Sequence, residues 1–129
     1  MTNNINGKKL NEHQFFYHKF ENCKIDFHLK TAIMQFLLLG YDGTDSGAEN
    51  RRLKVRQEHL DKISIFKKSG EFLFGGAILN DEGKMIGSMI VYEFPDRKTL
   101  DEKLKDEPYI TNGVWKKIEI KPFRHAKIE

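Results

Sequence analysis

Residues 51–78, RRLKVRQEHLDKISIFKKSGEFLFGGAI, decide how the rest of the chain is interpreted. At about 100° per residue, a helix over the first part of this stretch gathers its apolar side chains on one face, with Ile65 outside it. That face holds Leu53, Val55, Leu60, Ile63 and Phe66. Gly70 then stops the helix, and the apolar run FLFGGAIL at residues 72–79 predicts a strand. The stretch therefore predicts an amphipathic helix followed by a glycine-containing strand.

Three polar side chains fall in the middle of the apolar arc: Arg52, Arg56 and His59. A buried polar group without a partner costs a few kcal/mol, so this row needs either a wet pocket or an ion-pair network. A histidine on such a face is often a hydrogen-bonded core residue, and arginines are often structural salt-bridge partners. Because all three share one row, a functional site remains an equally good interpretation.

The segments on either side of this stretch predict three further strands and a second helix. MQFLLLGYD at residues 34–42 is apolar on both faces, which favours an interior strand that ends at Gly40 and the turn after Tyr41. Ser46 and Glu49 have the spacing of a capping box for the long helix, which we expect to end at Lys68. The paired Gly75 and Gly76 indicate a bulge or a close approach by a ligand or backbone.

The second half of the chain continues this pattern. NDEGK at residues 80–84 is typical of a hairpin turn, which leads into a strand over residues 85–94. Pro95 and Asp96 begin a short helix with Leu100 and Leu104 on its apolar edge. A loop or broken helix at residues 106–113 precedes the last strand, at residues 115–121.

The resulting order is strand, helix, strand, strand, helix, strand. This is the split βαβ pattern of a ferredoxin-like α+β domain with a four-stranded antiparallel sheet. Two helices cover only one face of such a sheet, yet three of the strands are apolar on both faces. We therefore expect a homodimer in which the second faces of two sheets pack together.

Composition places further limits on the protein. The 129 residues suit one domain, and 39% hydrophobic with 32% charged residues is typical of a soluble globular protein. The net charge of +3 does not predict a nucleic-acid partner, because basic and acidic residues are interleaved. The single cysteine, Cys23, excludes an internal disulfide, and no apolar run is long enough to span a membrane, so we expect a cytoplasmic protein without a membrane partner.

The chain is expected to divide at Met34. Residues 1–33 are rich in Asn and Lys and show no clear period, which predicts a poorly ordered or loosely packed N-terminal extension, unless the natural protein starts at Met34. The functional domain is expected over residues 34–125, and residues 126–129 form a short polar tail.

From Met34 to Phe123 the sequence resembles the YciI-like, or YCII-related, family of small dimeric α/β-barrel proteins. The resemblance depends on the order and spacing of several short motifs: Arg56 and His59 in RQEHL, Gly70, Gly75 and Gly76 in FGG, Gly87 with Ser88, Pro108, Tyr109 and Gly113 in EPYITNGVW, and Pro122 with Phe123. The family is associated with a His and Asp pair in a cleft. His59 matches the histidine, whereas the position of the family aspartate is Glu107, with Asp106 one residue earlier.

The resemblance implies acid/base chemistry by His59 with Glu107 or Asp106 in a cofactor-free enzyme of the lyase or isomerase kind. Substrate binding is expected from the arginines Arg52 and Arg56, from the strand glycines Gly75 and Gly76, and from Tyr109, with a compact, anionic or ring-bearing molecule as ligand. The alternative is a non-catalytic dimer that binds a metabolite or a partner protein. A divalent ion held by His59, Glu107 and Asp106 is a third hypothesis.

Overall fold

The computed structural model describes residues 3–5, 8–10 and 33–129. Near the N-terminus, β1 (Asn3–Ile5) and β2 (Lys8–Leu10) form a short antiparallel pair. The remaining residues of the predicted N-terminal extension, Cys23 among them, lie outside the described residues. The chain separates into two units, Met1–Ala32 and Ile33–Glu129, and the second one contains the predicted domain.

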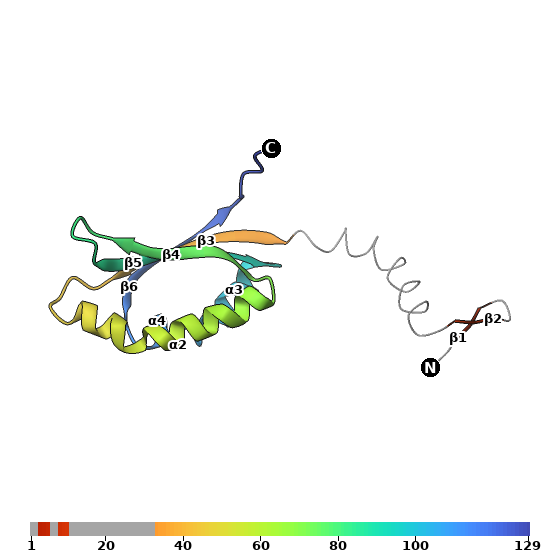
Figure 1. The fold of residues 1–129 in the computed structure, drawn as a ribbon, viewed down its shortest axis with the longest axis horizontal. Helices are drawn as coiled ribbons and strands as arrows, with labels where there is room; N and C mark the ends of the chain where they lie inside the picture. The colour runs from red at the N-terminus through yellow and green to blue at the C-terminus, as the bar shows by residue number, and fades with distance from the viewer. Residues whose placement is uncertain (1–2, 6–7, 11–32) are drawn as a thin grey trace. The chain divides into compact units, whose positions relative to one another are not determined.

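The second unit has the predicted ferredoxin-like fold. Its elements follow the order β3 (Met34–Asp42), α2 (Ala48–Lys68), β4 (Phe72–Leu79), β5 (Met85–Phe94), α3 (Arg97–Leu104), α4 (Pro108–Thr111) and β6 (Trp115–Phe123). The strands form one antiparallel sheet in the order β4-β5-β3-β6, and the helices lie on one side of it (Figure 1). The predicted α+β fold class and strand order are confirmed.

The central strand β3 pairs with β5 on one side and β6 on the other, which confirms that it is interior. Phe36 and Leu38 are buried on the helix side of the sheet. The strand does not end at Gly40 as predicted, because Gly40 is paired with Ser88 on β5 and Ile118 on β6. A Cβ atom on Gly40 would lie 2.5 Å from the Trp115 ring, so glycine is required there by close packing and not by a turn.

Helix α2 ends as predicted but begins differently. The cap residue is Gly47, and no side chain caps the helix, so the proposed box of Ser46 and Glu49 is wrong. Instead, Asp45 accepts a hydrogen bond from the Gly47 backbone N–H at 3.3 Å and forms an ion pair with Arg51 at 2.6 Å. A carboxylate two residues before the cap residue therefore orders the turn that a serine cap was expected to order.

The buried face of α2 is narrower than the apolar pattern predicted. Val55, Ile63 and Phe66 are buried, but Leu53 is 49% exposed and Leu60 is 37% exposed. Ile65, predicted to lie outside the face, is also exposed. The places at the centre of the face belong to Arg52 and His59, which are both buried, so polar groups have displaced the two leucines to its edges.

The glycines of β4 do not mark a bulge. The irregularities in its pairing with β5 fall between Phe72 and Phe74 and between Ile78 and Leu79, at the two ends of the strand. A Cβ on Gly75 would approach the Met89 carbonyl oxygen to 2.5 Å, whereas a Cβ on Gly76 would meet nothing within 4 Å. The close approach of another backbone therefore explains Gly75.

The C-terminal third of the domain consists of α3, α4 and β6. Asp96 caps α3 by accepting from the Thr99 backbone N–H at 2.7 Å, and Leu100 packs into the core as predicted. The predicted broken helix is the single turn α4, whose N-terminal cap is Glu107. Strand β6 extends two residues beyond its predicted end and includes Pro122, which an edge strand tolerates.

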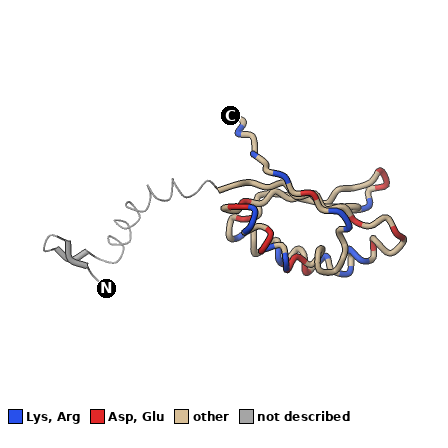
Figure 2. Tube along the Cα trace, turned by 180° about the vertical axis from the view of Figure 1, so that it is seen from behind, with Lys and Arg blue, Asp and Glu red and all other residues tan. Residues whose placement is uncertain are grey.

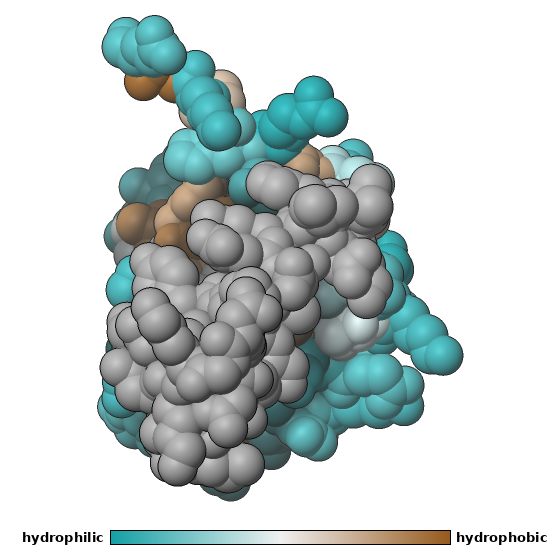
Figure 3. Space-filling view, turned by 90° about the vertical axis from the view of Figure 1, so that its right-hand side faces the viewer, coloured by the Kyte–Doolittle hydropathy of each residue, from teal (hydrophilic) through white to brown (hydrophobic). Residues whose placement is uncertain are grey.

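The face of the sheet opposite the helices is apolar at its centre. Its side chains alternate with those of the core and include Leu37 and Leu39 on β3 and Met89 and Val91 on β5. None of the helices within residues 33–129 covers this face (Figure 1). Basic and acidic residues are interleaved along the domain (Figure 2), and apolar surface is visible beside the hydrophilic C-terminal tail (Figure 3).

Candidate active site

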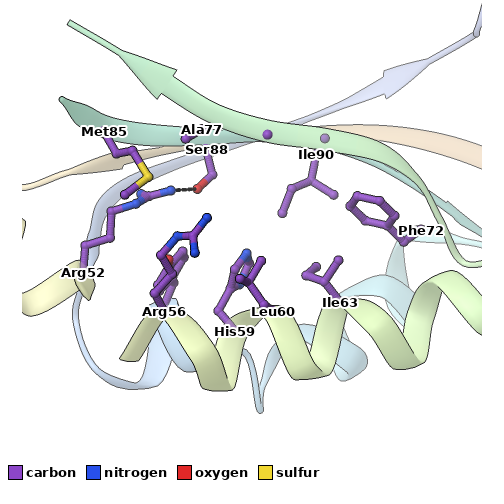
Figure 4. A pocket seen from close by; sticks show the side chains of 13 residues that line it. Arg52, Arg56, His59, Leu60, Ile63, Phe72, Ala77, Met85, Ser88 and Ile90 are labelled. Atoms are coloured by element: carbon purple, nitrogen blue, oxygen red, sulfur yellow. Dashed lines mark hydrogen bonds between the residues drawn. The ribbon is translucent and has the colours of Figure 1, made fainter. Parts of the chain in front are cut away.

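A cavity of about 110 Å³ lies between α2 and the strands β4 and β5 (Figure 4). The middle of α2 forms its floor, and the edge strand β4 forms much of its roof. Its lining residues are Arg52, Arg56, His59, Leu60, Ile63, Phe72, Gly75, Gly76, Ala77, Met85, Ser88, Ile90 and Tyr109. The arginine and histidine side chains extend from α2 toward the sheet. Every residue predicted to bind substrate therefore borders one cavity.

His59 forms a short contact with Glu107 at the base of the cavity. The Nδ1 atom of His59 lies 2.6 Å from Oε1 of Glu107, and the two side chains are 8% and 0% exposed. Because the carboxylate of Glu107 can only accept, Nδ1 carries the proton of this hydrogen bond. The other nitrogen, Nε2, has no hydrogen-bond partner within residues 33–129 and belongs to the part of the ring that lines the cavity. The tautomer with a lone pair on Nε2 is therefore favoured.

Tyr109 holds the imidazole from one side. Its ring stacks on His59 with 4.0 Å between centroids and an interplanar angle of 11°. The backbone N–H of Tyr109 donates to the same Glu107 oxygen at 3.0 Å, so the start of α4 fixes the carboxylate. Burial raises the pKa of the Tyr109 phenol, which keeps it neutral and able to donate a hydrogen bond.

Arg52 belongs to a buried network that the sequence did not reveal. Its Nη1 donates to both Asp42 oxygens, at 2.9 and 3.1 Å, and its Nη2 donates to Ser88 Oγ at 2.8 Å. Trp115 Nε1 donates to the same Ser88 oxygen at 3.2 Å. The Arg52 guanidinium also lies over the Tyr109 ring, 4.7 Å from its centroid. Of the two interpretations of the polar row, the ion-pair network is therefore the one that holds for Arg52. Asp42 was not among the predicted site residues, although a charged residue at the end of a buried strand could have indicated a partner for Arg52.

Arg56 differs from Arg52 although both line the cavity. It is exposed, and no hydrogen bond or ion pair joins its side chain to residues 33–129. Its guanidinium points into the cavity beside His59 (Figure 4). The wet-pocket hypothesis therefore describes Arg56.

Asp106 does not reach the imidazole. Its side chain is 86% exposed, and its Oδ2 lies 3.7 Å from Lys62 Nζ. Asp106 precedes the cap residue of α4, Glu107, and it is Glu107 that points to the imidazole. The expectation that Asp106 shares the role of Glu107 is thus wrong in its geometry. For the same reason His59, Glu107 and Asp106 do not converge on one point, and no group of three metal-ligating side chains forms in the described part of the chain.

A ferredoxin-like sheet with a buried histidine–carboxylate pair at the middle of its long helix defines a small α+β protein in which one imidazole faces a cavity. The chain belongs to the YCII-related domain family, whose model matches residues 34–124. This family match covers the whole sheet, all three helices of the domain and every residue of the cavity.

Known relatives agree with this assignment. The protein is 28% identical over 97 residues to Protein YciI of Escherichia coli O6:H1, covering 70% of this chain and 97% of the relative. It is 25% identical over 80 residues to an uncharacterized protein of Haemophilus influenzae, covering 57% of this chain and 82% of the relative.

Among solved structures, the chain resembles 5-chloro-2-hydroxyhydroquinone dehydrochlorinase from Burkholderia phenoliruptrix AC1100 in complex with 2,5-dihydroxybenzoquinone. The TM-score is 0.62 at 20% sequence identity, covering 72% of this chain and 96% of the other. This similarity supports the ferredoxin-like fold. Within the described residues, no helix has the length and apolar character needed to cross a membrane.

Proposed function

We propose that the protein is a small-molecule enzyme in which His59 and Glu107 carry out acid/base chemistry in the cavity beneath β4. The observation that carries this proposal is the 2.6 Å contact between His59 Nδ1 and Glu107 Oε1, with both groups buried and Nε2 on the cavity side. A histidine with one nitrogen held by a carboxylate and the other facing an open space is arranged to move a proton.

The geometry supports a reaction in which His59 first removes a proton from the substrate, after which the proton is returned or a leaving group departs. Nε2 of His59 removes a proton from the substrate, and the Glu107 carboxylate stabilises the resulting imidazolium across the Nδ1 hydrogen bond. The neutral phenol of Tyr109 stands beside the ring and can donate to an oxygen on which charge develops. Return of the proton to another atom gives an isomerase, and departure of a leaving group gives a lyase. Neither outcome requires a cofactor.

The dehydrochlorinase with the same fold supports this class of reaction, since its activity is the loss of a chloride and a proton from a ring compound. The substrate of the present protein is then a compact molecule with an acidic C–H or O–H group.

The proposal is tested by proton exchange. Small carbonyl and hydroxy-ring compounds are incubated with the protein in D₂O, and loss of C–H signals is followed by proton NMR. For a compound that exchanges, His59→Gln is expected to lower the rate by about 10² to 10⁴. Asp106→Asn is the matched control, because it removes a neighbouring exposed carboxylate and should leave the rate within about twofold. An unchanged rate in His59→Gln would refute the catalytic role.

The competing function, a non-catalytic binding module, makes a different prediction for the same variants. Compounds bind without exchange or turnover in the wild-type protein, and His59→Gln alters affinity or stability alone.

We also infer that two copies of the chain associate through the apolar face of the sheet. The support is the apolar character of Leu37, Leu39 and Met89, which are partly exposed on a face that the helices leave open. Leu39→Glu is expected to halve the mass measured by light scattering after gel filtration. Leu53→Glu, on the exposed side of α2, makes the same chemical change and should leave the mass unaltered.

The domain boundaries follow from the same evidence. Because the family match begins at residue 34, we propose that residues 34–125 fold without the N-terminal extension, and that removing residues 1–33 leaves the melting temperature of the domain within a few degrees. The single cysteine agrees with a reducing compartment, and we propose a cytoplasmic location.

A further inference from the structure

The cavity has two chemically different ends. Leu60, Ile63, Phe72 and Ile90 form an apolar end, and Arg52, Arg56 and His59 stand at the other. A dry cavity of about 150 Å³ can hold a benzene ring, so a space of about 110 Å³ that is open on one side suits a body of a single ring. The shape therefore selects a compact ligand with one apolar part and one polar part.

The charges around the cavity can be counted residue by residue. Arg52 is paired with Asp42 by two hydrogen bonds, so its charge is already matched. Glu107 contributes a negative charge next to His59, and Arg56 contributes a positive charge that no side chain of residues 33–129 pairs with. With a neutral imidazole these four charges sum to zero.

An anionic ligand changes this balance in a defined way. A monoanion beside Arg56 adds one negative charge, which one proton on His59 Nε2 cancels. A dianion leaves a net negative charge in a largely buried site, where the low dielectric makes an unmatched charge expensive. A neutral ligand gains nothing from Arg56.

The proton can be assigned to His59 because this side chain both lines the cavity and has a nitrogen without a hydrogen-bond partner in residues 33–129. The ionisable groups that face His59 are Arg52 and Arg56 on its own helix and Glu107 and Tyr109 on α4. The strands β4 and β5 line the cavity without an ionisable side chain. Glu107 accepts two hydrogen bonds at Oε1, and its buried Oε2 has no partner within residues 33–129, but Glu107 does not line the cavity. Asp42 accepts two hydrogen bonds from Arg52 and does not line the cavity either, and Tyr109 is held neutral.

We propose that the cavity binds a compact monoanion with one apolar ring, that Arg56 receives its anionic group, and that binding is accompanied by uptake of one proton at His59. This proposal rests on the proposed function in one respect: both place the moving proton on Nε2 of His59. It names the substrate class, which the acid/base pair alone does not.

The test is calorimetric titration of the full chain with three probes of similar size: benzoate, a monoanion; phthalate, a dianion; and benzyl alcohol, which is neutral. Titrations in Tris and in triethanolamine at one pH, slightly above neutral, give the number of protons exchanged from the difference in observed enthalpy. Benzoate is expected to bind about tenfold more tightly than either other probe, with uptake approaching one proton.

Two variants assign the groups. Arg56→Gln is expected to weaken benzoate binding about tenfold, whereas Lys54→Gln, the same loss of charge at an exposed position of α2, should leave it unchanged. His59→Gln should lose the proton uptake and bind benzoate more weakly, because the charge of the bound anion is then left unmatched.

The possible outcomes separate this proposal from the proposed function. If benzoate binds with proton uptake but no compound ever exchanges or turns over, the catalytic proposal fails and this one stands. Equal or tighter binding of phthalate or benzyl alcohol, binding of benzoate without proton uptake, or no binding of benzoate overturns this one.

Discussion

Replacing Gly40 with alanine should disturb both the core and the candidate active site. Gly40 lies near the C-terminal end of the interior strand β3, against the indole of Trp115. An added Cβ would lie 2.5, 2.6 and 2.7 Å from three carbons of that ring. Ordinary carbon contacts are about 3.5–4.0 Å, so the ring has to move by about 1 Å.

The cost can be estimated from what this movement breaks. Overpacking of a core by one methyl group costs about 1–3 kcal/mol. The Trp115 hydrogen bond to Ser88 is already 3.2 Å long, so a shift of the ring removes it and adds about 1 kcal/mol. Alanine recovers about 0.5–1 kcal/mol because it restricts the unfolded chain more than glycine does. Gly40→Ala should therefore lower the free energy of unfolding by about 1–3.5 kcal/mol.

Urea denaturation followed by tryptophan fluorescence is the assay, since Trp115 is the only tryptophan and reports on the ring that moves. Gly76→Ala is the matched control, because its Cβ would meet nothing within 4 Å and the same substitution should be neutral or stabilising. Protein concentration is held constant to separate folding from association. If the two variants have the same unfolding midpoint, the packing explanation of Gly40 is refuted.

Further predictions concern single side chains away from the cavity. Burial raises the pKa of the Tyr92 phenol, so its share of stability is complete below the unfolded tyrosine pKa of about 10 and is lost as the pH rises above it; alkaline unfolding of Tyr92→Phe should depend less on pH. The Tyr92 hydroxyl has no partner within residues 33–129, and its removal should stabilise the fold by up to about 1 kcal/mol. Hydrogen bonds from Thr99 lower the pKa of Asp96, so its contribution is present above the unfolded carboxyl pKa of about 3.9 and is lost as the pH falls through the lower folded value; Asp96→Ala should flatten acid unfolding monitored by circular dichroism. Leu100→Ala should cost about 3 kcal/mol in thermal or urea unfolding, against less than about 0.5 kcal/mol for Leu53→Ala.

The fold could be predicted because its signals are local. The strand order follows from the alternation of helical and extended patterns, and Gly70 and the NDEGK turn have the positive φ angles of 82° and 81° at Gly70 and Gly83 that such endings need. The start of α2 was missed because Asp45 and Ser46 are both suitable cap residues. Only the path of the loop decides which of them reaches a free backbone N–H.

The site could be predicted only in part, since its pairings join residues far apart in the sequence. His59 and Glu107 are separated by 48 positions, and the helix wheel placed Arg52 and Arg56 equally well on the inner face. Asp42 and Ser88 distinguish the two arginines, and both lie on strands whose register brings them beneath Arg52. A wheel describes one helix alone and contains no information on what the sheet presents to it.

The single Glu107 oxygen that holds both the Tyr109 backbone N–H and His59 has a consequence for heating the protein. Helix α4 is only four residues long, and such a turn opens at a smaller free energy than the sheet. Each time it opens, the carboxylate loses the anchor that aims it at the imidazole, while the strands stay paired. Activity should therefore decline, reversibly, at temperatures where the far-ultraviolet circular dichroism of the sheet has not begun to change.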